Sequence, residues 1–367
     1  MTYFPFFEYY LRTIALCAVF LPLNVVAEST VQYRVIDLGA VSGSEGITQG
    51  QAINDAGQAI ANSLAGDGSF LWENGVITEL EGPQGENSQT YALAINNLGQ
   101  VVGGTENSAL LWDKGTRTDL GTLPNYDGCG AQSINDAGLI VGACAMNTQP
   151  SLLVGYIWDS GIMTKISLGL GETGFFPTSV NNNGEVVGQV FGLGNQGIYG
   201  AIWQGGIVTP LSFSPTYNGD NGWVGTSGGY WDGSQLVDLQ SQGVRNVFGI
   251  NSRGEMVGES TGLPEAIIWD LENGVRKLAN LIDPNDPLRD SILRLQEAID
   301  INNRGQIMIM NGLLKSDESP FFTTHALLLT PMEKTSPHPR KIPVPFIALV
   351  LLSLVAIGAV LRISSGI

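Results

Sequence analysis

The sequence predicts an all-β protein, a seven-bladed β-propeller of four-stranded blades spanning residues 28–331. Three observations favour this fold. A short phrase with the pattern Asn-x-x-Gly recurs along the chain, strand and turn signals follow each copy, and a single strand before the first copy matches the strand missing after the last. Glycine supplies 48 of the 367 residues, which indicates many turns.

The repeated phrase is clearest in Ile53-Asn54-Asp55-Ala56-Gly57 and is most altered in the fifth copy, Tyr217-Asn218-Gly219-Asp220-Asn221-Gly222, which lacks the usual Ile-Asn pair. The spacings between successive copies are 42, 39, 46, 38, 32 and 51 residues, which is typical of a repeat fold with connections of variable length. The copies end at Gly57, Gly99, Gly138, Gly184, Gly222, Gly254 and Gly305.

Asn at the first position and Gly at the fourth suit a type I turn, in which the Asn side chain caps local backbone and Gly takes a left-handed conformation. We therefore interpret these asparagines as structural. An apolar strand with a small residue three places before its end follows each turn, and then come a glycine turn and a last strand. We expect the strand-ending residues to fill the space between neighbouring sheets: Trp72, Trp112, Trp158, Trp203, Trp231, Trp269 and, in the seventh place, Leu329.

The ends of the repeat region predict how the ring closes. Residues 31–39 match the fourth strand of the other units, whereas the last unit ends at residues 325–331 without that strand. We expect the two segments to pair, since a closed ring of blades leaves no open sheet edge.

Two apolar segments flank the repeats. Residues 1–27 carry one cation, Arg12, before an apolar run with a small-residue exit, which predicts a cleaved signal peptide; an uncleaved N-terminal anchor is the alternative. Residues 332–341 form a polar tether, and residues 342–362 contain 20 uncharged residues followed by Arg362, which predicts a transmembrane helix. This tail resembles bacterial C-terminal sorting tails, and a plain tail anchor explains the same residues. We therefore expect an exported protein on the periplasmic face of the membrane or at the cell surface.

The repeated phrases also resemble a known family. Ala-Ile-Asn-x-x-Gly-Gln-x-x-Gly, small-x-x-Trp, Asp-Leu-Gly and a closing His-Ala-Leu-Leu-Leu-Thr-Pro look like the HAF-repeat family, extracellular repeat proteins of bacteria, over nearly all of residues 31–331. The resemblance implies export and a repeat architecture, and it implies no established reaction.

Charge and histidine content narrow the possible functions. Residues 28–331 hold 12 Lys and Arg against 32 Asp and Glu, so we exclude nucleic acid as a partner. The chain has two histidines, His325 and His338, too few for a zinc site or a Ser-His-Asp relay that uses several histidines. We expect a monomeric, non-catalytic binding module for a protein or a glycan. The alternative is a propeller hydrolase or lyase that acts on an extracellular polysaccharide with paired carboxylates.

Calcium is the one cofactor that the sequence leaves open. Asn218, Asp220 and Asn221 lie on a glycine-rich loop, and Asp283, Asp286 and Asp290 lie near a proline-rich one; both sets offer the oxygen ligands that calcium prefers. Neither set matches a complete calcium-binding loop. The segment 288–297 could form a short helix on the ring.

The repeat region contains two cysteines, Cys129 and Cys144, which flank one Asn-x-x-Gly turn. A plain hairpin register places them opposite each other, while a glycine bulge at the turn would offset them by one residue. We predict a disulfide, with two buried thiols as the alternative.

Length differences among the repeats predict where binding occurs. All of them fall in the connections on the face opposite the Asn-x-x-Gly turns, and variable loops on a rigid scaffold usually carry recognition. We expect the exposed ligand-binding residues on this face to include Tyr126, Asp127, Glu172, Phe175, Phe176, Tyr199, Phe321 and Phe322. The alternative is that these rings pack down their own loops. We predict no catalytic residue.

Overall fold

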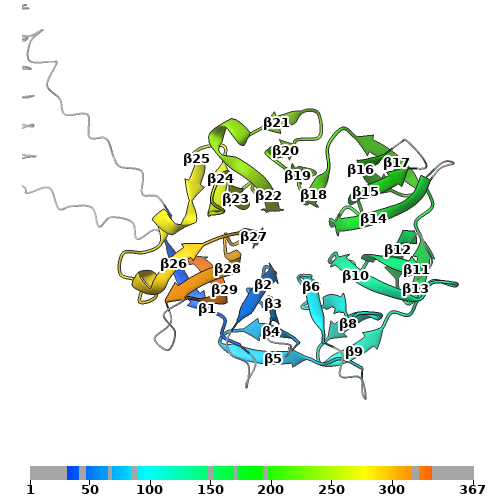
Figure 1. The fold of residues 1–367 in the computed structure, drawn as a ribbon, viewed down its shortest axis with the longest axis horizontal. Helices are drawn as coiled ribbons and strands as arrows, with labels where there is room; N and C mark the ends of the chain where they lie inside the picture. The colour runs from blue at the N-terminus through cyan, green and yellow to red at the C-terminus, as the bar shows by residue number, and fades with distance from the viewer. Residues whose placement is uncertain are drawn as a thin grey trace, which may run out of the picture. The chain divides into compact units, whose positions relative to one another are not determined.

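The computed structural model describes residues 31–40, 47–64, 68–83, 89–146, 152–168, 172–192, 197–315 and 322–332. In this part of the chain, residues 32–332 form one compact unit, a ring of seven antiparallel sheets (Figure 1). The predicted propeller is confirmed. Each sheet is a blade, and in all but the last blade the strands follow the chain from the inner strand to the outer one.

The first three blades have four strands each. Blade 1 contains β2 (Thr48–Ile53), β3 (Ala59–Ser63), β4 (Ser69–Glu73) and β5 (Val76–Leu80). Blade 2 contains β6 (Tyr91–Ile95), β7 (Val101–Gly104), β8 (Ala109–Asp113) and β9 (Thr116–Asp119). Blade 3 contains β10 (Gly128–Ile134), β11 (Ile140–Met146), β12 (Leu152–Asp159) and β13 (Ile162–Lys165).

The next three blades repeat this plan. Blade 4 contains β14 (Glu172–Val180), β15 (Val186–Gly192), β16 (Ile198–Gln204) and β17 (Ile207–Leu211). Blade 5 contains β18 (Pro215–Asn218), β19 (Val224–Thr226), β20 (Gly229–Trp231) and β21 (Leu236–Asp238), followed by the 3-10 helix η2 (Gln240–Gln242). Blade 6 contains β22 (Val244–Ile250), β23 (Met256–Ser260), β24 (Ala266–Asp270) and β25 (Gly274–Lys277).

Blade 7 joins the two ends of the repeat region. The 3-10 helices η3 (Leu278–Leu281) and η4 (Arg289–Ser291) lead into an interrupted inner strand, β26 (Ile292–Leu295) and β27 (Ala298–Ile301), which pairs with β28 (Ile307–Lys315). Next is β29 (Phe322–Pro331), and the outer strand is β1 (Tyr33–Asp37) from the start of the unit. Tyr33 lies opposite Pro331 and Asp37 opposite Leu327, so the predicted closure by residues 31–39 is confirmed.

The inner hairpins share one geometry. All seven connections between the first and second strands are five residues long, and the glycine at the fourth turn position has a φ between +74° and +84° in every blade. That conformation is open to Gly at little steric cost, as the sequence predicted. The inner strand also has a one-residue bulge three to four residues before each turn, as between Gly50 and Ala52.

The core lies between neighbouring blades. Trp72 of blade 1 packs with Met308 and Leu328 of blade 7, and Trp112 of blade 2 packs with Leu80 of blade 1. The small residues before the tryptophans allow this approach: a Cβ on Gly155 would lie 2.8 Å from the carbonyl oxygen of Phe175 in the next blade. The tryptophans named here therefore fill the space between sheets, as expected.

The bulge also settles the register of the two cysteines. Next to the turn, Ile134 lies opposite Ile140, which is one residue beyond the partner that a plain hairpin register would give it. The bulge between Ala131 and Ser133 shifts the pairing back by one residue. Cys129 then lies directly opposite Cys144, and the two form a disulfide.

The short helix expected at residues 288–297 is wrong, and three other predicted segments fall outside the residues that the structure describes. Residues 288–297 contain only the three-residue helix η4 and then strand β26, because Ile292–Leu295 pairs with β28 and extends the sheet. The predicted signal peptide, the tether apart from Met332, and the predicted transmembrane segment lie outside the described residues. Among those that are described, no helix is long and apolar enough to cross a membrane.

Candidate functional site

The Asn-x-x-Gly turns meet around the central channel of the ring. We call this side the Asn-turn face and the opposite side the variable face. A cavity of about 110 Å³ opens at the centre of the Asn-turn face, and its wall is made from the turn residues of all seven blades together with Tyr217 and Asp300.

The first turn residues form an inner ring of hydrogen bonds. Asn54 Oδ1 accepts the backbone N–H of Gln58 at 2.9 Å, which caps its own turn, and Asn54 Nδ2 donates to the carbonyl oxygen of Asn96 in the next blade at 3.0 Å. The same two contacts are made by Asn96, Asn135, Asn181, Asn251 and Asn302. The asparagines are therefore structural, as predicted, and they also link one blade to the next.

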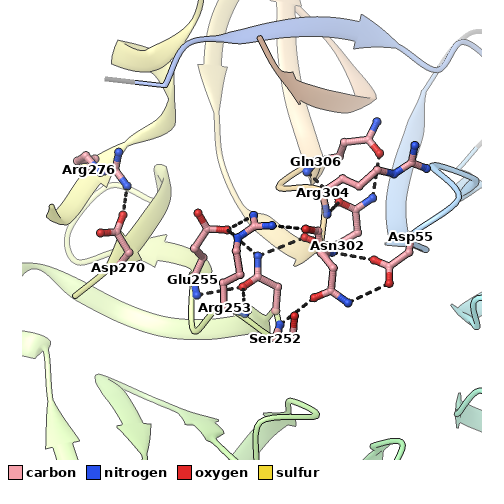
Figure 2. Close-up of polar contacts among 11 residues, drawn as sticks. Asp55, Ser252, Arg253, Glu255, Asp270, Arg276, Asn302, Arg304 and Gln306 are labelled. Atoms are coloured by element: carbon pink, nitrogen blue, oxygen red, sulfur yellow. Dashed lines mark hydrogen bonds and ion pairs between the residues drawn. The ribbon is translucent and has the colours of Figure 1, made fainter. Parts of the chain in front are cut away.

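The second turn residues form an outer ring in which carboxylates and carboxamides largely alternate. The backbone N–H of Asn97 donates to Asp136 Oδ1 at 2.8 Å, and Asn97 Nδ2 donates to Asp136 Oδ2 at 3.0 Å. Asn182 makes equivalent bonds to Asp220. Figure 2 shows where blades 6, 7 and 1 meet, with Ser252, Asn302 and Asp55 labelled. The N–H of Ser252 donates to Asn303, and Asn303 donates to Asp55. These bonds link the turns of neighbouring blades around the channel.

The inner ring is interrupted between blades 5 and 6. Gly219 replaces the asparagine of the turn and has no side chain to donate to blade 6. The preceding Asn218 reaches blade 4 instead, where its Nδ2 donates to the carbonyl oxygen of Glu185 at 2.8 Å. Asn218 is 2% exposed, and within the described part of the chain its Oδ1 has no hydrogen-bond partner. The altered sequence of the fifth copy is the physical reason for this gap.

Asp300 and Tyr217 occupy a position in the inner strand where the other blades have Ala, Ser or Gly. Burial raises the pKa of Asp300 to about 6, and the nearby Asp55 adds to the effect, although the N–H groups of Ile53 and Ile301 donate to the carboxylate and oppose it. Burial also raises the pKa of Tyr217, and four surrounding carboxylates raise it further. The channel wall therefore favours neutral forms of both groups. Sequence reasoning missed them, although the break in the small-residue pattern could have identified them.

The candidate residues on the variable face lie in different environments. Phe175 is 1% exposed and belongs to the core of blade 4, so its expected exposure is wrong: on β14 it pairs with Val190, inside the sheet packing. Tyr126 and Tyr199 are half-buried and pack against the cores of blades 3 and 4; Phe176 is half-buried and Asp127 is exposed. Phe321 and the side chains of Glu172 and Phe322 lie outside the described part of the structure.

Four of the six residues considered for calcium, Asp220, Asn221, Asp283 and Asp286, use their side-chain oxygens in structural hydrogen bonds. Asn221 Oδ1 accepts the N–H of Trp223 at 3.0 Å, and both oxygens of Asp220 accept from Asn182. Asp283 and Asp286 are buried, and Asp286 Oδ2 accepts the N–H of Val35 at 2.9 Å, which ties this loop to the closing strand. Among the described residues, no group of three or more His, Cys, Asp and Glu side chains is arranged to hold a metal ion.

His325 has a structural contact as well. Its Nδ1 lies 2.7 Å from Asp37 Oδ2 and so connects β29 to β1. Burial opposes ionisation of Asp37, but hydrogen bonds from His325 and from the N–H of Gly39 outweigh it and lower the pKa of this carboxyl.

No family model matches this chain, and no curated protein matches it in sequence. Among solved structures, it is similar to selenomethionine-substituted virginiamycin B lyase from Staphylococcus aureus, with a TM-score of 0.51, 11% identity and coverage of 82% of this chain and 99% of that chain. A catalytically inactive variant of that lyase with quinupristin has a TM-score of 0.50, 14% identity and the same coverage. At these identities the likeness shows the fold alone.

Proposed function

We propose that the chain is an exported, non-catalytic β-propeller of the HAF-repeat type that binds a protein or a glycan through its variable face, at the periplasmic face of the membrane or at the cell surface. The observation that carries this proposal is a structural difference between the two faces: one has uniform central turns and the other has connections of variable length. At the centre of the Asn-turn face lie seven five-residue turns, which are hydrogen-bonded to one another except between blades 5 and 6, whereas connections on the variable face range from two residues to fourteen.

Two further features support the proposal. The Cys129–Cys144 disulfide lies at the base of two variable-face connections, β9–β10 and β11–β12, and disulfides form and persist in oxidising compartments. The apolar sequence of residues 342–361 is long enough for a membrane span, and it follows the polar tether. A rigid ring with loops on one side, held at the membrane, suits the presentation of a binding surface.

A test of the proposal is a glycan and envelope-protein binding screen with the full chain in detergent. For the ligand that emerges, Tyr126→Ala, Phe176→Ala and Tyr199→Ala should each weaken binding several-fold, since recognition surfaces depend on a few aromatic contacts. Leu271→Ala, at an exposed position in the outer turn of blade 6, is the control and should bind normally. Normal binding by all three aromatic variants would contradict the assignment of the variable face.

One observation favours the second candidate, a hydrolase or lyase. Asp300 faces the central channel, and burial raises its pKa to about 6, which suits a general acid or base. The described residues that line this cavity include Asn, Asp, Ser and Tyr but no cation or histidine. Loss of polysaccharide cleavage in Asp300→Asn, with the fold intact, would support this candidate over the first.

A further inference from the structure

A second concave region lies between blades 1 and 2, toward the outer part of the Asn-turn face. Its cavity volume of about 570 Å³ falls in the range of small-ligand pockets. The floor is apolar, with the half-buried Leu71 and the buried Leu80 of blade 1 and the buried Val101 and Trp112 of blade 2. We call this region the blade 1–2 groove.

The two walls of the groove carry opposite charges. Glu73 lines it from β4 of blade 1, on the same face of the sheet as Leu71, and Lys114 and Arg117 line it from the outer hairpin of blade 2. The ion pairs that the described residues form do not include any of these three side chains, so an acid and two cations face the same cavity without pairing across it. A ligand that bridges the groove could satisfy both walls at once.

Comparison of the repeats shows that a cation at the position of Arg117 is specific to blade 2. Arg117 pairs with Trp112 across the outer hairpin, and the other blades place an apolar residue at that position. Those residues are Ile77, Met163, Val208, Leu236, Val275 and Val35. Packing between the strands of the repeat therefore does not require a cation at this position, so packing does not explain why blade 2 has Arg117 there.

Two hydrogen bonds fix the end of the groove. Trp112 Nε1 donates to the carbonyl oxygen of Glu81 at 3.0 Å, and Arg117 Nη1 donates to that of Gly82. Both bonds run from blade 2 to the connection after β5 of blade 1 and hold the two walls in register. Arg117 has further N–H donors beyond the one used, and Lys114 is exposed.

We propose that the blade 1–2 groove binds a zwitterionic ligand with an apolar side chain, an amino acid or a short peptide with free ends. Its ammonium group lies against Glu73, its carboxylate lies against Lys114 and Arg117, and its apolar side chain covers Leu71 and Trp112. The separation of opposite charges above an apolar floor matches the chemistry of such a ligand. This site is distinct from the variable face, so the two proposals succeed or fail independently.

The test uses the full chain in detergent and leucyl-leucine as the probe, with binding measured by calorimetry. Leucyl-leucine should bind saturably, and N-acetyl-leucyl-leucine and leucyl-leucine amide should each bind at least about tenfold more weakly, because each loses one charged contact. Glu73→Gln should abolish the preference for the free ammonium group. Lys114→Gln should abolish the preference for the free carboxylate.

Control variants come from exposed charges on the outer strands of blades 2 and 3. Asp119→Asn and Lys165→Gln alter exposed charges outside the groove and should leave all three affinities unchanged. The proposal is overturned if leucyl-leucine does not bind saturably, if only one of its two charges affects affinity, or if the control variants change affinity as much as the groove variants.

Discussion

Asp300 shows how one residue in the channel wall affects the stability of the whole ring. Its pKa is about 6 in the folded protein against 3.8 for an ordinary aspartate. Because the folded state holds the proton more tightly, this group stabilises the fold below pH 3.8, and that contribution is lost as the pH rises through 6. We expect Asp300→Asn, which keeps an acceptor for the Ile53 N–H, to be more stable than the native chain at neutral pH by about 1–2 kcal/mol.

The measurement for this prediction is urea unfolding of both proteins at several pH values. The difference in unfolding free energy should vanish in acid below the pKa of an ordinary aspartate and grow between that pH and neutrality. A constant difference across the whole pH range would show that the carboxyl does not titrate as its surroundings imply.

Phe175 and Asn54 mark the limits of prediction from sequence at the scale of single residues. The role of Asn54 is local, since its turn and its capping bond are encoded within five residues, and it was predicted correctly. The burial of Phe175 depends on which face of β14 meets the next sheet, and two bulges in that strand change the alternation of its side chains. Adjacent aromatic residues in a strand do not indicate which one points inward.

At the scale of elements, hairpins with strong turn chemistry were predictable and the irregular segment before blade 7 was not. Asn-x-x-Gly gave the position of all seven inner hairpins, including the altered copy at residues 217–222. Residues 278–291 contain no such signal, and their structure depends on buried contacts with a distant strand, as between Asp283 N–H and Tyr33 O. Long-range contacts of this kind leave no local pattern.

The disulfide between β10 and β11 allows a test at the same scale. We expect the double variant Cys129→Ser, Cys144→Ser to lose about 2–3 kcal/mol of unfolding free energy, because the bond closes a short loop and limits the freedom of the unfolded chain. The measurement is urea unfolding of both proteins with and without reductant, together with thiol counting on unreduced protein. Two free thiols at Cys129 and Cys144 in the unreduced native chain would contradict the pairing.

For the whole molecule, closure of the ring was predictable because it follows from counting strands. The first unit has one strand too many and the last has one too few, so pairing of β1 with β29 removes both open edges. What the sequence did not indicate is how that strand is secured. Asp286 holds it from the connection before blade 7, and His325 holds it from β29, over sequence separations of 251 and 288 residues.

The contact between Asp286 and Val35 gives a prediction about the stability of the ring. Asp286 is 7% exposed; one of its oxygens accepts the Val35 N–H and the other accepts the Leu288 N–H. Asp286→Ala leaves both donors without their acceptor, so we expect a loss of about 1–3 kcal/mol. Because a closed propeller depends on its last strand pair, hydrogen exchange should accelerate in β1 and β29 before it does in blades 3 and 4.

The control for this prediction is Asp290→Ala, an exposed change in the same connection, which should leave hydrogen exchange unaltered. Uniform acceleration in all blades of Asp286→Ala would mean that the ring unfolds as one unit and that this contact does not control its opening.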